Sequence, residues 1–198
     1  MKALSLCLTL GVLVVAAALV RPAQPARASA PAGSYRVDGT HSSLVFRVSH
    51  MNLAPFYGRF NEISGTFEFD PNDASKLAID VQIKAESIDT NSSRRDGHLK
   101  GPDFFNAKEF PTIRFKSSGA TKIADKKYKV SGDLSLHGVT KPVTLTVEHT
   151  GSGNQRGAEV QGFDVTGTIK RSEFEMKYML NGLGDEIRLM AGIEGAKR

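Results

Sequence analysis

Residues 91–115, NSSRRDGHLKGPDFFNAKEFPTIRF, are the one stretch of the chain that does not follow the pattern of a strand or a tight turn. Their first half predicts a short helix, because Asn91 or Ser92 is available as an N-cap and Gly101-Pro102 supplies a stop. Their second half holds four of the 11 phenylalanines, at Phe104, Phe105, Phe110 and Phe115. We expect this stretch either to close or line one end of a β-structure, or to cover an open sheet edge as a plain helical plug.

The N-terminal segment, residues 1–28, is typical of a secretory signal peptide. Met1-Lys2 is followed by an apolar segment over residues 3–20 and then by small residues, with cleavage expected near Ala28. An uncleaved membrane anchor is the alternative, because the apolar segment approaches the length that spans a bilayer. Cleavage predicts a periplasmic or secreted protein.

Removing this segment changes the chemistry of the chain. The one cysteine, Cys7, is lost, so disulfides, thiol catalysis and thiolate metal sites are excluded from the mature protein. The formal net charge falls from +5 to +2, because Lys2, Arg21 and Arg27 go and no acidic residue goes with them. Without a basic run that carries interleaved aromatic residues, the sequence gives no support for nucleic-acid binding.

The remainder of the chain predicts one domain, residues 35–198, after a short flexible leader at residues 29–34. Residues 77–84 show the cleanest alternation of apolar and polar side chains. Similar segments recur with hairpin-length connections, while residues 151–154 are expected to form a loop and residues 171–185 to be irregular. We therefore predict an all-β fold of about eight antiparallel strands with one short helical insertion. Alternation alone leaves a closed barrel and a solid sandwich equally open.

Motifs for catalysis or metal binding are absent from the sequence. The five histidines include no pair with metal-ligand spacing, and although His41, His50 and His98 could meet in space, we predict no metal site. A GxSxG nucleophile motif and a phosphate-binding glycine loop are also missing. We therefore predict that the protein is not an enzyme.

The sequence resembles the YceI-like family of bacterial polyisoprenoid-binding proteins from about Tyr35 to the C-terminus. Seven elements carry the resemblance in the expected order: His41-Ser42-Ser43 with Phe46 and His50; Gly58-Arg59-Phe60 with Ser64-Gly65; Ser87-Ile88-Asp89-Thr90; Arg95-Asp96-Gly97-His98-Leu99 with Asp103-Phe104-Phe105; Phe110-Pro111-Thr112 with Phe115-Lys116-Ser117; residues 132–143, GDLSLHGVTKPV; and Arg171-Ser172-Glu173-Phe174. One departure is Glu175, where the family usually has glycine after the aromatic residue.

The resemblance implies a single lipocalin-like antiparallel β-barrel that is exported to the periplasm, forms a homodimer in many members, and holds an isoprenoid lipid. An isoprenoid quinone or a polyprenyl phosphate is the expected kind of ligand, with transient membrane contact and no other cofactor. Eight strands form a barrel wide enough for one such chain.

Two groups of residues are candidates for the binding site. The first is the expected tunnel lining, set against the alternative that each member is ordinary core: Phe46, Phe60, Phe67, Ile79, Val81, Phe104, Phe105, Phe110, Phe115, Val130 and Leu134. The second comprises candidate headgroup contacts, with an ionic network that anchors the helix as the alternative: Arg95, Asp96 and His98. Other functions left open are a carrier of fatty acid or fatty amide, a solid-core interaction module and an isoprenoid-modifying enzyme.

Overall fold

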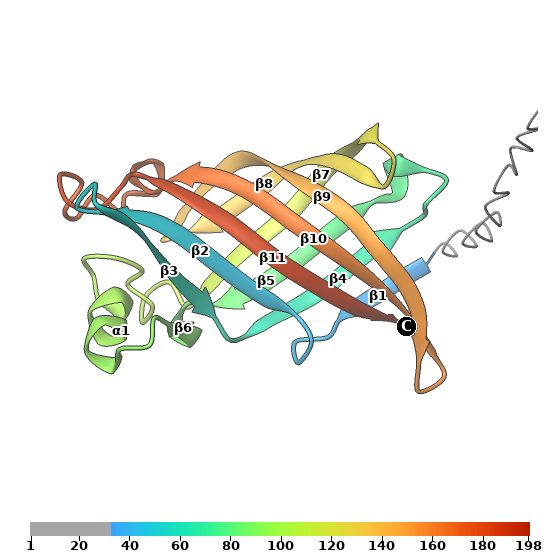
Figure 1. The fold of residues 1–198 in the computed structure, drawn as a ribbon, viewed down its shortest axis with the longest axis horizontal. Helices are drawn as coiled ribbons and strands as arrows, with labels where there is room; N and C mark the ends of the chain where they lie inside the picture. The colour runs from blue at the N-terminus through green and yellow to red at the C-terminus, as the bar shows by residue number, and fades with distance from the viewer. Residues whose placement is uncertain (1–32) are drawn as a thin grey trace, which may run out of the picture.

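Eleven antiparallel strands make up most of residues 33–198, the part of the chain that the computed structural model describes (Figure 1). The strands are β1 (Gly33–Val37), β2 (Ser43–His50), β3 (Ala54–Phe60), β4 (Ile63–Phe69), β5 (Ala78–Lys84), β6 (Ile88–Asp89), β7 (Thr112–Ala124), β8 (Lys127–Leu136), β9 (Val139–Gln155), β10 (Ala158–Lys170) and β11 (Glu186–Lys197). One α-helix and three 3₁₀ turns complete the elements: α1 (Ser93–Lys100), η1 (Ala74–Lys76), η2 (Ala85–Ser87) and η3 (Arg171–Phe174).

The last strand closes the sheet into a barrel. One edge of β11 pairs with β10, and its other edge pairs with both β2 and β1, in the registers Leu44 with Ala191 and Tyr35 with Lys197. Because β1 also pairs with β4, the hydrogen-bonded ring has no free edge there. The predicted antiparallel barrel is confirmed, and the solid sandwich is excluded.

Three positions around the ring are each occupied by two short strands placed end to end. β11 faces Val37 of β1 and then Ser43 of β2, so these two strands follow one line with a turn between them. β3 and β4 are likewise separated only by residues 61–62, and η2 separates β5 from β6. The eleven strands therefore build an eight-stranded barrel.

Aromatic side chains fill the end of the barrel where β1 lies. The Phe69 ring lies 5.0 Å from Phe163 and 6.1 Å from Tyr128, and Phe67 stacks on Tyr35 at 5.1 Å. All five rings are at least 95% buried. We call this the closed end, because its edge-to-face and stacked rings leave little space between the strands.

The opposite end is covered by α1 and the loop that follows it (Figure 1). Ser92 caps the helix by accepting a hydrogen bond from the Arg95 amide, and Gly101 ends it. The loop then folds back, because the amides of Phe105 and Ala107 donate to the carbonyls of Leu99 and Lys100 at 3.0 and 2.9 Å. The expectation that this stretch closes one end of the β-structure is confirmed.

Three sequence predictions need correction or lie outside the structure. Gly33 and Ser34, predicted to belong to the leader, are part of β1 and pair with β4. Residues 151–154 are not a loop, because pairing with β10 extends β9 to Gln155 and overrides their weak strand propensity. The turn comes after Gln155, at Arg156 and Gly157, whose φ angles of 51° and 85° suit a tight hairpin. The predicted signal peptide lies outside the described residues.

Gly65 offers a direct test of how closely β4 and β5 approach each other in the barrel wall. It adopts φ = 140° in β4, and a Cβ there would collide with the carbonyl oxygen of Asp80 on β5. We expect Gly65→Ala to lower the free energy of unfolding by about 1–3 kcal/mol, measured by urea titration. Gly119→Ala is the control, because its Cβ would meet no atom within 4 Å. Equal stability of the two variants would contradict the strand geometry.

Candidate functional site

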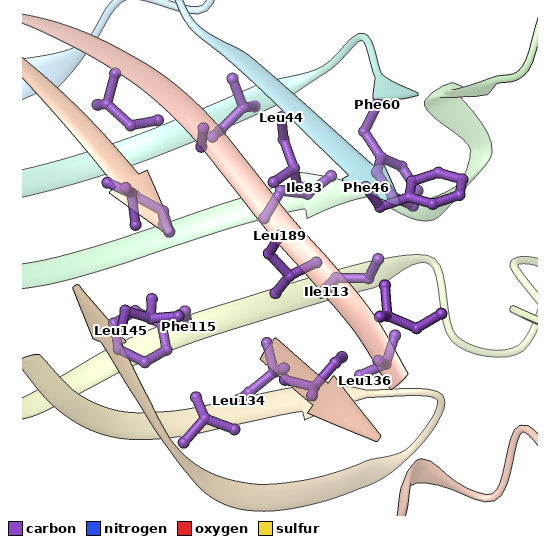
Figure 2. A pocket seen from close by; sticks show the side chains of 18 of the residues that line it. Leu44, Phe46, Phe60, Ile83, Ile113, Phe115, Leu134, Leu136, Leu145 and Leu189 are labelled. Carbon is purple, nitrogen blue, oxygen red and sulfur yellow. The ribbon is translucent and has the colours of Figure 1, made fainter. Parts of the chain in front are cut away.

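The barrel encloses an apolar cavity between the closed end and α1 (Figure 2). Its volume is about 210 Å³, and thirty residues line it. Figure 2 shows side chains from strands on opposite walls, such as Leu44, Ile113 and Leu189, turned toward a shared space. Every lining residue except Arg171 is apolar. The cavity therefore offers its occupant hydrocarbon contacts and almost no hydrogen-bonding groups.

Nine of the eleven residues predicted to line a tunnel lie on the cavity wall: Phe46, Phe60, Phe67, Ile79, Val81, Phe104, Phe105, Phe115 and Leu134. The other two lie elsewhere. Phe110 packs its ring against His137, 5.1 Å away, beneath Gly138. Val130 is fully buried in the packed core, in register with Ala120 and Leu145.

The wall contributed by β9 and β11 was not predicted from the sequence. Inward-facing residues of these two strands line the cavity: Val143, Leu145, Val147, Ile187, Leu189, Ala191 and Ile193. The signal was available, because these residues recur at every second position. A barrel brings every inward face onto the same space, so each alternating strand contributes to the wall.

The three candidate headgroup residues anchor α1 and do not line the cavity. The Arg95 side chain donates to the hydroxyl and carbonyl oxygens of Thr90 at 2.8 and 2.6 Å, and its guanidinium lies 4.4 Å from the Phe56 ring centre. Asp96 accepts from the Thr90 amide at 2.9 Å, and His98 pairs with Asp103 at 2.9 Å. This geometry supports the alternative of a network that anchors the helix.

Arg171 is the one ionisable side chain on the cavity wall, and backbone carbonyls occupy it. It is only 4% exposed. Its nitrogens donate to carbonyl oxygens at 2.7 to 2.9 Å; the acceptors are Met176, Tyr178, Leu183 and Gly184. Burial lowers the pKa of the Arg171 guanidinium. Arg171 thus fixes the loop of residues 175–185 that joins η3 to β11.

Three rings join that loop to the α1 segment. His98, Phe104 and Tyr178 lie 5.1 to 5.4 Å from one another, each pair tilted edge to face. Phe104 also lines the cavity. No backbone hydrogen bond joins the α1 segment to this loop within the described residues, so separating the two breaks side-chain contacts alone.

Polar groups are buried beside the closed end. A His149 ring nitrogen lies 2.9 Å from the Gln161 side-chain oxygen, and the Gln161 amide donates to Glu159 at 2.9 Å. Glu159 also accepts from the Tyr35 hydroxyl at 2.7 Å and pairs with Lys197. Burial lowers the pKa of His149, whereas burial and the nearby Glu159 carboxylate raise the pKa of Tyr35. This chain is satisfied internally and lies outside the cavity wall.

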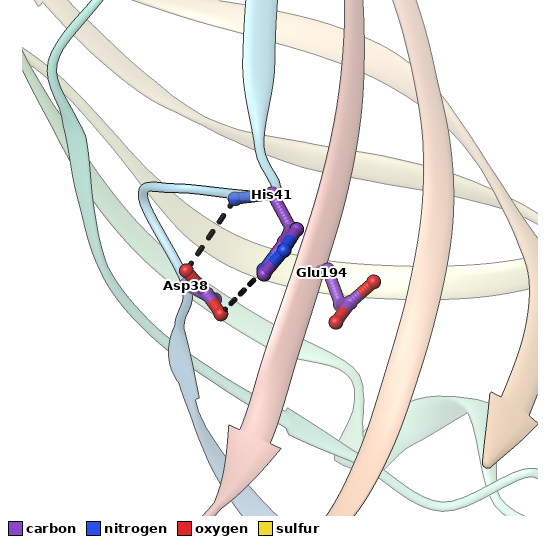
Figure 3. Close-up of side chains that lie close together, drawn as sticks. All are labelled: Asp38, His41 and Glu194. Carbon is purple, nitrogen blue, oxygen red and sulfur yellow. Dashed lines mark hydrogen bonds and ion pairs between the residues drawn. The ribbon is translucent and has the colours of Figure 1, made fainter. Parts of the chain in front are cut away.

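One cluster of potential metal ligands lies on the outer surface (Figure 3). Ligand atoms of Asp38, His41 and Glu194 all lie within 4.8 Å of one another. Asp38 already pairs with His41 at 2.9 Å, and Glu194 accepts from Gln155 at 2.9 Å. The hydrogen bond from His41 lowers the pKa of Asp38 and raises that of His41. An exposed ion pair explains the arrangement fully.

Comparison with known proteins identifies the family. The profile of the YceI-like domain matches residues 35–195, nearly all of the described chain. The chain belongs to the YceI-like family. A UPF0312 protein of Photorhabdus laumondii is 38% identical over 172 residues, which cover 85% of this chain and 89% of that protein.

Solved structures agree with this YceI-like assignment. The Campylobacter jejuni YceI protein superposes with a TM-score of 0.69 at 34% identity, covering 76% of this chain and 90% of that one. Burkholderia cenocepacia BcnA superposes with a TM-score of 0.72 at 29% identity, covering 80% and 98%. A domain from Saccharophagus degradans shares the fold, with a TM-score of 0.62 at 17% identity and coverage of 83% and 98%.

Glu175, the departure from the YceI-like pattern, keeps a backbone that suits glycine. It adopts φ = 62° and ψ = 9°, the left-handed conformation that caps η3. Its carboxylate pairs with Lys177 at 2.6 Å on the surface. The substitution thus changes the exterior of the loop and leaves the cavity wall unaltered.

Among residues 33–198, no helix combines the length and the hydropathy needed to span a bilayer.

Arg171→Met tests how the loop over the cavity is held. Four carbonyl groups lose their donor, so we expect the free energy of unfolding to fall by about 3 kcal/mol in urea titrations. Amides of residues 183 and 184 should also lose protection from hydrogen exchange. Lys177→Met is the control in the same loop, because the Lys177 side chain pairs with the Glu175 carboxylate at the surface. Unchanged protection in Arg171→Met would contradict the role of Arg171.

The pKa values of His41 and His149 should be shifted from the ordinary histidine value in opposite directions. NMR should place the midpoint of His149 below 6.5 and that of His41 above 6.5. The unfolded chain takes up a proton near pH 6.5 and the buried His149 does not, so His149 makes the fold less stable as pH falls through 6.5. Asp38→Asn should lower the His41 midpoint, because the Asp38 carboxylate is the main cause of the raised pKa. A His149 midpoint above 6.5 would contradict the buried arrangement.

Proposed function

We propose that this protein binds the hydrocarbon tail of an isoprenoid lipid, of the quinone or polyprenyl phosphate type, inside its barrel. The observation that carries the proposal is the wall of the cavity, in which the one polar side chain, Arg171, is bound to backbone carbonyls. The Saccharophagus degradans domain with the same fold is described as polyisoprenoid binding, which supports this choice of ligand.

The free energy of transfer suits a carrier. Burying hydrocarbon from water contributes about 0.8 kcal/mol per CH₂-sized group, so each five-carbon unit contributes on the order of 3 to 4 kcal/mol before costs. Ordering the chain offsets part of that gain. When the donor is a bilayer, the tail exchanges one apolar environment for another and the net gain approaches zero. Such a balance allows the lipid to be released as well as taken up.

The cavity is too small to hold a long prenyl chain without widening. At about 210 Å³ it lies below the usual range of pockets that enclose small-molecule ligands, which begins near 300 Å³. A long prenyl chain therefore has to widen the cavity. Widening is easiest at the α1 end, because α1 has no buried residue and only side chains join its loop to residues 175–185.

Binding explains the cavity better than catalysis does. General acid–base chemistry needs two ionisable groups within reach of each other, and Arg171 is the one ionisable group on the wall. The YceI-like fold is also that of binding proteins. In this proposal residues 1–28 direct export, the mature protein works in the periplasm or outside the cell, and a homodimer and membrane contact accompany its function.

The test is organic extraction and mass spectrometry of protein purified from its cells. We expect a prenyl lipid; a straight-chain mass would instead support a fatty acid or fatty amide carrier. Ala191→Phe places a ring in the cavity and should lower the bound lipid on the order of tenfold, equivalent to about 1.4 kcal/mol. Met190→Phe, on the outer face of β11, is the matched control and should keep the lipid. Absence of prenyl lipid, together with no uptake of quinone or polyprenyl phosphate, would contradict the proposal.

A further inference from the structure

Two loops at the α1 end expose large apolar side chains. Leu53, between β2 and β3, is 86% exposed and Met51 is 50% exposed. Met179 and Leu180, between η3 and β11, are 47% and 40% exposed. We call residues 51–53 and 178–182 the tip loops. Burial of such side chains in water-excluding surroundings is favourable, so their clustering at one end indicates a contact surface.

The tip loops form one surface. The Met51 amide donates to the Gly182 carbonyl at 2.6 Å, and the Gly184 amide donates to Ser49 at 2.9 Å. Met51 Sδ and Met179 Cε both lie beside Gly182, since a Cβ on that residue would come within 2.9 and 3.2 Å of them. Figure 1 shows the two loops side by side at the end where α1 lies.

This surface is continuous with the cavity and carries no charge. Residues 51–57 and 178–184 contain no acidic or basic side chain, although 24% of the chain is charged. Val48 and Leu183, which flank the tip loops, line the cavity. An apolar path thus leads from the cavity wall to the tips.

An unbalanced positive charge lies just behind the tip loops. Arg47 and Arg188 sit directly opposite each other on the outer faces of β2 and β11. Like charges in this register repel each other, and within residues 33–198 no carboxylate forms an ion pair with either arginine. They line an outer groove with Ser49, Lys170 and Gly184, which reaches the loop of residues 175–185. Of the two acidic residues there, Asp185 accepts from Ser172 and Glu186 stands opposite Lys170.

We propose that the tip loops and the Arg47–Arg188 pair dock the protein on an anionic lipid bilayer. This inference rests on the proposed function and names the partner of the α1 end. The uncharged tips enter the interface, where apolar side chains leave water, and the arginines meet lipid phosphates beside them. Docking in this orientation sets the cavity and its α1 cover against the membrane, the source of an isoprenoid lipid.

Vesicle flotation tests the docking surface. We expect the mature protein to bind vesicles of phosphatidylcholine and phosphatidylglycerol, and Leu53→Ser/Leu180→Ser to weaken binding on the order of tenfold. Arg47→Gln/Arg188→Gln should remove the preference for phosphatidylglycerol over pure phosphatidylcholine. Ile123→Ser is the matched control, because Ile123 is 53% exposed near the β7–β8 turn, away from α1, and should bind normally. Equal binding by all variants, or none by the wild type, would overturn the docking surface.

A second measurement separates docking from ligand binding. All four proteins should take up a short, water-soluble prenyl alcohol equally, while Leu53→Ser/Leu180→Ser should extract prenyl quinone from vesicles more slowly. Vesicle binding without uptake of either prenyl compound would refute the proposed function and leave docking intact. Sedimentation tests a dimer interface. If the wild type is a dimer that does not bind vesicles, and Leu53→Ser/Leu180→Ser is a monomer, the tip loops join two copies of the chain and the membrane proposal is wrong.

Discussion

The closure of the sheet by β11 is the constraint on which the rest of the structure depends. A strand has two hydrogen-bonding edges, and β11 uses one for β10 and shares the other between β1 and β2. Once the ring is closed, alternate side chains of all its strands must face the same interior. The cavity follows from this geometry, because eight strands leave more room than the inward side chains fill between the aromatic closed end and α1.

The two ends of the barrel differ in what holds them. Edge-to-face and stacked aromatic rings fill the closed end, a satisfied polar chain lies beside it, and long hairpins of paired backbone surround it. At the α1 end, the strands end and α1 and loops cover the barrel. Arg171 holds the loop of residues 175–185, Thr90 holds α1, and three rings join the loop to the α1 segment. Side-chain contacts are easier to break and remake than a strand ladder, so the structure favours entry at the α1 end.

The alternation of apolar and polar residues predicts which side chains line the cavity better than it predicts how the sheet closes into a barrel. Ile79, Val81 and Leu134 were placed on the wall because every second residue of an antiparallel strand faces the same side. Nothing local reveals that β11 shares its edge between two strands, since that pairing joins residues more than 140 positions apart. The extension of β9 through residues 151–154 was missed because pairing with β10 overrides the weak strand propensity of these residues, and Phe110 was misplaced because its ring packs against His137 instead of the cavity. Arg171 is visible as a motif, but its four carbonyl partners come from a loop whose path only the fold defines.

Methyl NMR during titration with a prenyl quinone tests the central claim most directly, because it reports where the chain lies. We predict that methyl signals of Ile83, Ile113 and Leu189, which face one another across the cavity, shift together and saturate at the same quinone concentration (Figure 2). The methyl groups of Ile123, outside the barrel, should not move. Shifts confined to exposed residues, or no shift at saturating quinone, would contradict an isoprenoid-binding interior.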